Sequence, residues 1–192
     1  APKLTAAQSI EVEWDGAQPT LAWGWKQPSG KALLTQWRTT PLAVDWNKDG
    51  LTDLVMLDQQ GYLAYFERAQ VDGRLVLKSP RRAFCDEQGQ PLQLSKGKAG
   101  ASGRRKLCVV DWDGDGKLDL LLNSTSANLL RQVESPAGSW RFKDEGPLVK
   151  QNIEGHDVSP TTVDFDADGV PDFLGGAEDG KFYFLKNPRS AK

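Results

Sequence analysis

The sequence predicts an all-β fold, and more narrowly a section of a β-propeller with three to four blades. Three observations support this. An acidic loop pattern, Asp-x-Asp/Asn-x-Asp-Gly-x-x-Asp, occurs three times, and each copy lies between two short apolar runs. Those runs are rich in aromatic and β-branched residues and are broken by Gly, Asp and Asn, which is typical of strands. No segment carries a sustained helical period.

The copies of the loop begin at Asp45, Asp111 and Asp164, at intervals of 66 and 53 residues. Both intervals are a little longer than the four-stranded blades of known propellers. The polar stretch 86–105 accounts for the longer interval, as an extended loop or a decorated outer strand. We divide the chain into a partial or degenerate blade at 1–40, two blades with acidic loops at 41–104 and 105–157, and an incomplete third such blade at 158–192.

Within 1–40 we expect strands at 10–14, 21–25 and 33–37. Three to four blades are fewer than most propellers need to close a ring. We therefore expect the chain to be part of a larger, about seven-bladed propeller, or to be completed by another chain or a second copy.

Composition excludes two classes of protein. The longest apolar runs fall far short of the ~20 residues of a membrane-spanning helix, and the mean hydropathy is −0.52. The formal net charge of −2 gives no reason to expect nucleic acid as a partner, although the residues outside the acidic loops are net basic. The first residues lack the apolar core of a signal peptide, so a signal has been removed or the chain is an internal fragment. Cys85 and Cys108 form one disulfide or remain two small buried thiols, and sequence leaves both open.

The acidic loops have the oxygen-rich spacing of calcium sites. Calcium takes six to eight hard oxygen ligands, and a loop with oxygens at alternate positions can wrap around it. A glycine at the sixth position allows the sharp turn. No Glu stands at the twelfth position, so the loops are not EF-hands and the ninth-position Asp has to complete the shell. The predicted ligands of three Ca²⁺ ions are Asp45, Asn47, Asp49, Leu51 (carbonyl) and Asp53; Asp111, Asp113, Asp115, Lys117 (carbonyl) and Asp119; and Asp164, Asp166, Asp168, Val170 (carbonyl) and Asp172.

Two details refine this prediction. Asn47 replaces a carboxylate in the first loop, so we expect the first site to be the weakest. Trp46, Trp112 and Phe165 follow the first Asp of each loop. A large aromatic residue at one repeated position indicates packing between blades.

The repeats resemble FG-GAP/VCBS blades, the calcium-loop blades of integrin α-subunit propellers and of many secreted bacterial proteins. The resemblance covers 41–187 and includes the stretch Phe173-Leu174-Gly175-Gly176-Ala177. It implies a β-propeller, bound calcium, and a secreted, periplasmic or cell-surface location. The repeats are also similar to those of proteins that bacteria use on polysaccharides. This resemblance does not indicate which reaction, if any, the protein catalyses.

The face opposite the acidic loops carries the remaining candidates. Arginine there suits an anionic polysaccharide, because its guanidinium pairs with carboxylates or sulfates. The candidate ligand-binding residues are Arg38, Arg104, Arg105, Asn128, His156 and Glu178. Most such residues are ordinary turn residues, and a lone loop histidine usually only donates or accepts hydrogen bonds.

Three functions remain open from the sequence. The first is a calcium-stabilised module that binds polysaccharide or supports a carbohydrate-active enzyme. The second is part of a polysaccharide lyase or glycoside hydrolase acting on uronic-acid polymers, with His156, Tyr62 and Arg104 as weak catalytic candidates. The third is an integrin-like adhesion module.

Overall fold

The computed structural model describes residues 6–7, 9–20, 30–96, 105–124, 126–153 and 158–190 of the chain. In these ranges the protein forms thirteen strands and no helix, so the predicted all-β fold is confirmed. The same ranges contain no helix long and apolar enough to cross a membrane.

The first sheet has three antiparallel strands in the order β1 (Leu42–Val44), β2 (Asp53–Leu57) and β3 (Leu63–Phe66). The central strand β2 is buried on both faces, which explains its uninterrupted apolar sequence. After β3 in the chain, β4 (Arg68–Val71) and β5 (Arg74–Leu77) form a separate hairpin. Asp72 and Gly73 close that hairpin with φ values of 48° and 75°, as a tight two-residue turn requires.

The second sheet is a complete four-stranded blade with a fifth strand on its outer edge. Its own strands are β7 (Leu107–Val110), β8 (Asp119–Leu122), β9 (Asn128–Val133) and β10 (Trp140–Pro147). The fifth is β6 (Phe84–Asp86), which pairs parallel to β10 and comes from the segment that precedes this blade in the chain. Only Asp86 of the polar stretch 86–105 belongs to this added edge strand; residues 87–96 form no strand, and 97–104 lie outside the described residues.

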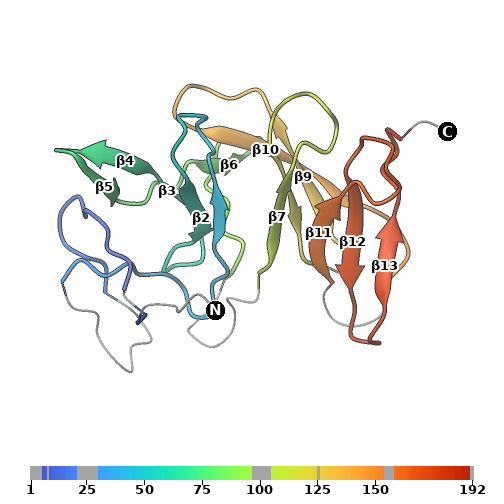
Figure 1. Cartoon of the computed structure of the whole chain (residues 1–192), viewed down its shortest axis with the longest axis horizontal. Coiled ribbons are helices and arrows are strands. Elements are labelled where there is room, and N and C mark those ends of the chain that lie inside the picture. The colour runs from blue at the N-terminus through green and yellow to red at the C-terminus, as the bar shows by residue number, and fades with distance from the viewer. Residues whose placement is uncertain are drawn as a thin grey trace.

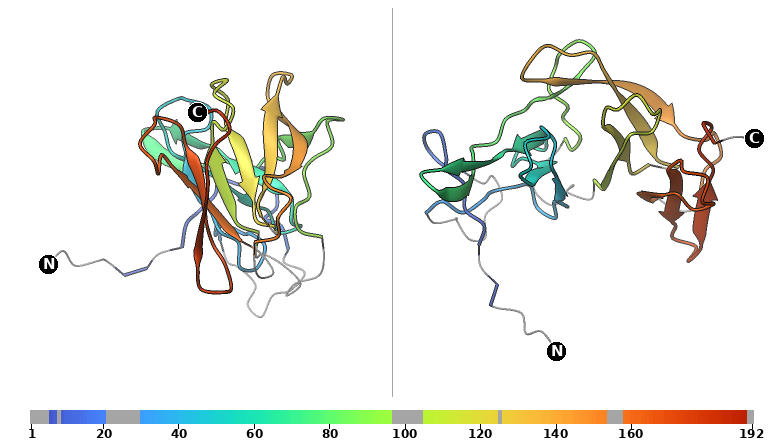
Figure 2. Two further views of the ribbon diagram at one scale, coloured as in Figure 1. Left: turned by 90° about the vertical axis from the view of Figure 1, so that its right-hand side faces the viewer. Right: turned by 45° about the horizontal axis from the view of Figure 1, so that its top comes forward.

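The third sheet contains β11 (Ser159–Val163), β12 (Asp172–Gly176) and β13 (Phe182–Leu185), all antiparallel. The three sheets follow one another along the molecule (Figure 1), and they do not close into a ring in the part of the chain that the structure describes. Their first strands approach one another: β1 contacts β7, and β7 contacts β11. The right-hand view in Figure 2 shows the three sheets in the same order. The chain is thus a partial propeller.

Large apolar side chains fill the spaces between consecutive sheets. Trp46 lies between the first and second sheets, 4.9 Å from the Phe84 ring and 5.6 Å from the Trp140 ring. Trp112 packs between the second and third sheets with Leu121 and Phe173. The predicted role of the two tryptophans in inter-blade packing is confirmed, whereas Phe165 at the same position of the third loop is 61% exposed and packs between no two described sheets.

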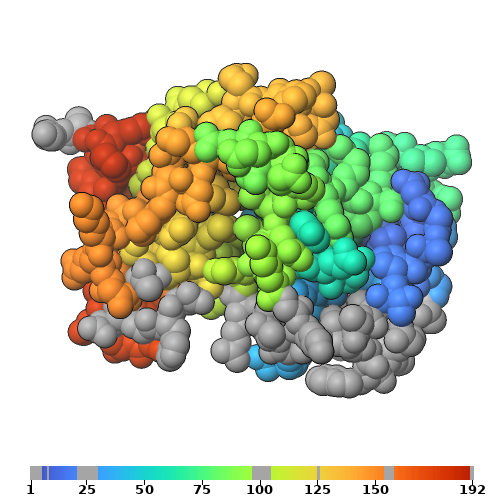
Figure 3. Space-filling view, turned by 180° about the vertical axis from the view of Figure 1, so that it is seen from behind, coloured from blue at the N-terminus to red at the C-terminus, as the bar shows by residue number. Residues whose placement is uncertain are grey.

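The N-terminal segment is less regular than expected. Segment 21–25 lies outside the described residues, and 10–14 and 33–37 form no strand. Segment 10–14 contributes two isolated bridges, Glu11 with Ala32 and Glu13 with Lys78, and segment 33–37 contributes none. Val12 is nevertheless buried against Met56 and Phe66 of the first sheet. Figure 3 shows this segment (blue) beside the β4–β5 hairpin, at the end of the molecule opposite the third sheet (red).

The two cysteines are free thiols. Cys85 lies on β6 and Cys108 on β7, which are the two opposite edges of the five-stranded second sheet. Three strands separate them at ~4.8 Å per strand, well beyond the reach of a disulfide. The disulfide alternative is therefore excluded by the topology of this sheet.

Candidate metal centres

The three acidic loops occupy the same place in the three sheets. They connect β1 to β2, β7 to β8 and β11 to β12, and each pair of strands is antiparallel. The loops consequently lie at one end of the sheets, the upper end in Figure 1. The turns that connect the second strand to the third lie at the opposite end.

Each loop is folded by hydrogen bonds from its own backbone to its first aspartate. The amide nitrogen of the sixth-position glycine donates to that carboxylate over 2.9 Å in Asp45, 3.1 Å in Asp111 and 2.9 Å in Asp164. The glycines themselves have φ values of 84° to 87°, a conformation that other residues adopt at a cost. This geometry turns the alternate side chains toward a common centre.

The fifth-position aspartates complete the turn. Asp49 accepts a hydrogen bond from the Leu51 amide over 2.8 Å, and Asp115 and Asp168 accept the equivalent bonds over 2.9 and 3.0 Å. The predicted carbonyl ligands Leu51, Lys117 and Val170 therefore lie in a tight turn directly after the acidic positions. Each has its amide bound to a neighbouring carboxylate.

The ninth-position aspartates, Asp53, Asp119 and Asp172, are fully buried and share one set of hydrogen bonds. One oxygen accepts the amide of the aromatic residue at the second position, over 2.9 Å in Asp119 and 3.1 to 3.2 Å in the others. The other oxygen accepts an amide at or just after the third strand, over 2.7 to 2.8 Å. Each of these carboxylates thus joins the loop, the second strand and the third-strand side of the sheet.

A buried carboxylate is costly unless its charge is compensated. Burial raises the pKa of Asp119, and the backbone hydrogen bonds from Gln132 and Trp112 partly oppose that shift. A carboxylate oxygen that accepts one hydrogen bond keeps a lone pair for a cation. Of the three buried aspartates, Asp172 lies within 4.8 Å of Asp164 and Asp166 and fits the role of the ligand that closes the shell, whereas Asp119 lies outside the group that Asp111, Asp113 and Asp115 form.

Two loops already bring their carboxylates within the span of one ion. The ligand atoms of Asp111, Asp113 and Asp115 lie within 4.8 Å of one another, as do those of Asp164, Asp166 and Asp172. In the first loop, the Asn47 side-chain amide instead donates to Asp49 over 2.9 Å. The donor set is carboxylate, amide and carbonyl oxygen, which suits calcium, whereas zinc favours nitrogen and sulfur.

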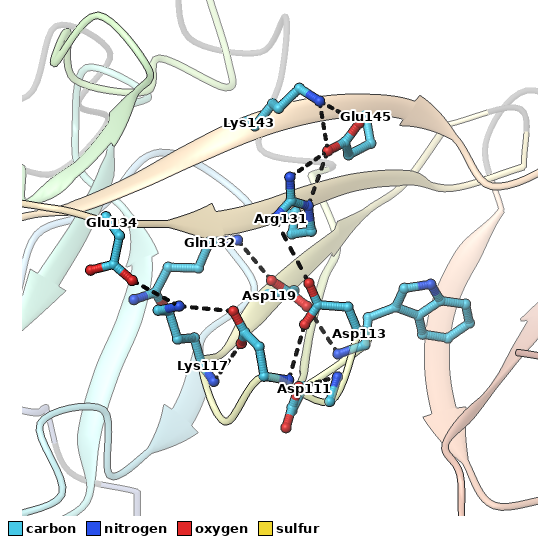
Figure 4. Close-up of polar contacts among 12 residues, drawn as sticks. Asp111, Asp113, Lys117, Asp119, Arg131, Gln132, Glu134, Lys143 and Glu145 are labelled. Atoms are coloured by element: carbon cyan, nitrogen blue, oxygen red, sulfur yellow. Dashed lines mark hydrogen bonds and ion pairs between the residues drawn. The ribbon is translucent and has the colours of Figure 1, made fainter. Parts of the chain in front are cut away.

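Basic side chains, which the sequence prediction missed, also contact the second and third loops. Lys117 Nζ lies 2.8 Å from Asp115 and 3.1 Å from Glu134 (Figure 4). Its hydrogen bond lowers the pKa of Asp115. Arg131, which is held by Glu145, reaches Asp113 at 3.8 Å.

In the third loop, Lys186 Nζ lies 2.5 Å from Asp166 and 3.2 Å from Asp168. The hydrogen bonds to these two carboxylates raise the pKa of Lys186. Lys117 stands inside the loop motif and could have been noticed from the sequence. Arg131 lies on β9 and Lys186 directly follows β13, and only the pairing of those strands in their sheets brings the two side chains to the loops.

The residues predicted for the opposite face are only partly described. His156 and Arg104 lie outside the described residues. The Arg38 guanidinium stacks 4.3 Å over the Trp37 ring, and Arg105 donates to the carbonyls of Leu94 and Asn123 over 2.8 and 3.2 Å.

The other candidates on that face also make contacts within the protein. Asn128 is half-buried in β9, where it pairs with Leu122 and Pro147. The Tyr62 ring is covered by the Arg82 guanidinium at 3.9 Å, and Arg82 also pairs with Asp58 over 2.6 Å. Glu178 lies in the turn between β12 and β13 and has interactions of its own. The structure thus brings two aromatic–arginine pairs to this face, and the sequence predicted neither pair.

Comparison with protein families gives one result that matches the geometry. The model of the FG-GAP-like repeat matches residues 45–122 and again residues 111–175, which together span more than half of the chain. Each match begins at the first aspartate of one acidic loop and runs through the next loop. Comparison with curated proteins gave no significant match.

Proposed function

The chain belongs to the FG-GAP-like repeat family, and from that premise we propose that it is a calcium-stabilised section of a β-propeller in an exported protein. One observation carries the proposal. In each of the three repeats a fully buried aspartate closes the acidic loop at the same end of the sheet. Backbone amides at two equivalent positions of the repeat donate to each of these aspartates. Such a buried charge repeated three times calls for a cation at each site.

The residues of this chain prepare each site. The sixth-position glycine and the first aspartate form the turn, and the ninth-position aspartate ties that turn to the third-strand side of the sheet. Calcium, when bound, supplies the positive charge that the clustered carboxylates lack. Its binding would therefore hold the first, second and third strands of a blade together. This stiffens the blade rather than performing chemistry.

A calcium titration tests this function. Isothermal titration calorimetry of chelator-treated protein should show three equivalents of Ca²⁺, with the Asn47 site the weakest. The midpoint of thermal unfolding should rise in calcium, because a ligand that binds only the folded state stabilises it. Magnesium, which needs stricter octahedral geometry, is the matched control and should act weakly. An unchanged unfolding midpoint in millimolar calcium would overturn the proposal.

We further propose that the face opposite the acidic loops binds an anionic polysaccharide. The exposed Arg38, whose guanidinium lies over the Trp37 ring, supports this, whereas Arg82 lies over Tyr62 but is already paired with Asp58. An aromatic ring can stack on a sugar, and a guanidinium can pair with its carboxylate.

Affinity electrophoresis in gels that contain polygalacturonate tests this second step. The chain should be retarded there but not in neutral dextran, and the Arg38→Ala variant should migrate faster than the wild type in polygalacturonate. Arg74→Ala, on the exposed β4–β5 hairpin, is the control and should not change migration. Equal migration of the chain in both polymers would contradict polysaccharide binding.

A further inference from the structure

The segment that follows β13 connects the second acidic loop to the third. Asn187 lies two residues after that strand and is 1% exposed. Its backbone N–H donates to Asp172 Oδ1 over 2.8 Å. Its side-chain nitrogen donates to the carbonyl of Pro171 over 2.9 Å and to the carbonyl of Trp112 over 3.1 Å. One buried side chain therefore contacts the backbone of both loops.

Arg189 adds a second contact to the same part of the second loop. Its Nε donates to the Trp112 carbonyl over 2.9 Å, and its Nη2 lies 3.4 Å from the Asp111 carbonyl. The guanidinium also lies directly against Gly114, where an added Cβ atom would collide with Nη1. The Trp112 carbonyl thus accepts two hydrogen bonds from outside its own loop, and these hold the peptide that leads into Asp113.

These hydrogen bonds join the two groups of clustered carboxylates. Asp172 belongs to the group of the third loop, and Asp113 belongs to the group of the second. The path between them runs from the Asp172 carboxylate through Asn187 to the carbonyl of Trp112, which directly precedes Asp113. The hydrogen bonds at both ends of this path are buried, and burial strengthens hydrogen bonds because water does not compete for them.

The equivalent residue of the first sheet lacks this link. Arg68 donates its backbone N–H to the buried Asp53, and its side chain donates to the carbonyl of Thr52 over 3.1 Å. Asn187 makes both of these bonds at the same positions of the third sheet and adds the bond to Trp112. The bond to the neighbouring loop is therefore an addition to the contacts that close a single loop.

The contact between the first and second loops is weaker. The Lys48 ammonium lies 3.4 Å from the Gly116 carbonyl, and both residues are exposed. A hydrogen bond of that length is near the outer limit, and an exposed lysine loses little freedom in making it. The second loop should therefore respond to the state of the third loop more than to the state of the first.

We propose that Asn187 and Arg189 are positioning residues of the second calcium site and couple it to the third site. Calcium at the third site holds Asp172 in one arrangement, which fixes Asn187 and, through it, the Trp112 carbonyl. The second loop then loses less conformational freedom when it binds its own ion, so its affinity rises. By linkage, calcium at the second site must tighten the third site by the same factor. The proposal rests on the proposed calcium function and adds which sites act together.

Site-resolved nuclear magnetic resonance of the whole chain tests this coupling. Gly50, Gly116 and Gly169 each donate a backbone N–H to the first aspartate of their own loop, so their amide signals report the three sites separately during a calcium titration. Asp166→Ala removes an exposed ligand of the third site. It should raise the calcium midpoint of Gly116 roughly fivefold or more and leave the midpoint of Gly50 unchanged.

The matched control is Asn47→Ala, which changes the same loop position in the first site. It should leave the Gly116 midpoint unchanged. Asp113→Ala, at that position of the second loop, should raise the Gly169 midpoint by the factor that Asp166→Ala gives for Gly116, because coupling is reciprocal.

A double-mutant cycle assigns the coupling to the two residues. In the Asn187→Ala background, loss of the third site should no longer change the Gly116 midpoint. Arg189→Ala should reduce the dependence, and because Arg189 is exposed this variant should fold even where the buried Asn187→Ala does not. Arg68→Ala, at the equivalent position of the first sheet, should leave the dependence intact.

The outcomes separate this inference from the proposed function. A Gly116 midpoint that is the same with and without the third site would overturn the coupling and leave three independent calcium sites. Coupling that persists in Arg189→Ala and in any folded Asn187→Ala would place the path elsewhere and overturn the roles of these residues. Failure of all three glycine signals to respond to calcium would contradict the proposed function and the coupling together.

Discussion

At the residue scale, the ninth-position aspartate has two roles in each repeat. It accepts backbone amides from two different parts of the blade, and it is the buried charge that a calcium ion would compensate. In Asp53 the Tyr65 hydroxyl adds a third hydrogen bond, over 2.7 Å, and burial raises the pKa of that tyrosine. The residue therefore contributes to the fold even before a metal binds.

Replacement of Asp119 by Asn tests both roles. The side-chain amide of Asn accepts hydrogen bonds only at its oxygen. The backbone N–H of either Trp112 or Gln132 would therefore face the NH2 group of Asn, which is also a donor. Leaving a buried donor unpaired costs ~1–3 kcal/mol. We expect chemical denaturation without calcium to show a loss of that size, and the added stability in calcium to be smaller than in the wild type. Glu134→Gln, at an exposed partner of Lys117, should change neither quantity.

Lys186 is the residue-scale feature that distinguishes the third loop. Its ammonium group bridges two predicted calcium ligands, Asp166 and Asp168, and so competes with the ion. Exposed ion pairs are individually weak, so Lys186→Met should tighten the third site only modestly, by roughly two- to fivefold in calorimetry. Lys78→Met, which breaks a pair with Glu67 away from the loops, should leave all sites unchanged. Weaker binding in the Lys186 variant would show that this lysine orders the loop instead of competing with calcium.

At the element scale, β12 shows why two neighbouring glycines are not equivalent. A Cβ atom on Gly175 would lie 2.3 Å from Val158 and 2.6 Å from the Phe173 ring. Both neighbours are buried between the second and third sheets, so neither has room to move. A Cβ atom on Gly176 would meet only Phe182, at ordinary distances of 3.7 and 3.8 Å.

Gly175→Ala should therefore destabilise the protein by ~1–3 kcal/mol, the usual cost of overpacking a core. Gly176→Ala is the matched control and should stay within ~0.5 kcal/mol of the wild type. Urea unfolding of the two variants measures both values. Equal stability of the two would mean that β12 can shift away from β11, contrary to the tight packing described above.

At the scale of the whole molecule, stability depends on the contacts between sheets. Among the described residues no sheet is closed on itself, and the two largest apolar clusters lie between the first and second sheets and between the second and third. The tryptophan after the first aspartate is at the centre of each contact. Each sheet should therefore be poorly stable without its neighbour, as in other repeat proteins.

The three equivalent aromatic positions allow a direct test. Trp46→Ala should cost ~3–5 kcal/mol, because a large buried ring leaves a cavity. Phe165→Ala, at the same position of the third sheet, should cost less than ~1 kcal/mol in dilute protein, because its ring is 61% exposed. Denaturant unfolding at low concentration measures both. A large loss from Phe165→Ala in dilute protein would mean that this ring is already covered within one chain.

The sequence by itself determined the features that depend on neighbouring residues. The acidic loops, their glycine turns and the apolar runs on either side are encoded within about a dozen positions, because loop and strand conformation follow from local spacing. The repetition of Trp46 and Trp112 also predicted inter-sheet packing before any contact was known. These predictions were correct because each needed only the residues within one repeat.

The tertiary structure alone decided the features that join distant parts of the chain. The parallel pairing of β6 with β10, the separation of Cys85 from Cys108, the cover that Val12 gives the first sheet and the contact of Lys186 with the third loop all involve residues far apart in the sequence. Such contacts depend on which faces remain to be buried after the local elements have formed. No local pattern encodes that choice, because it is set by the packing of whole sheets against one another.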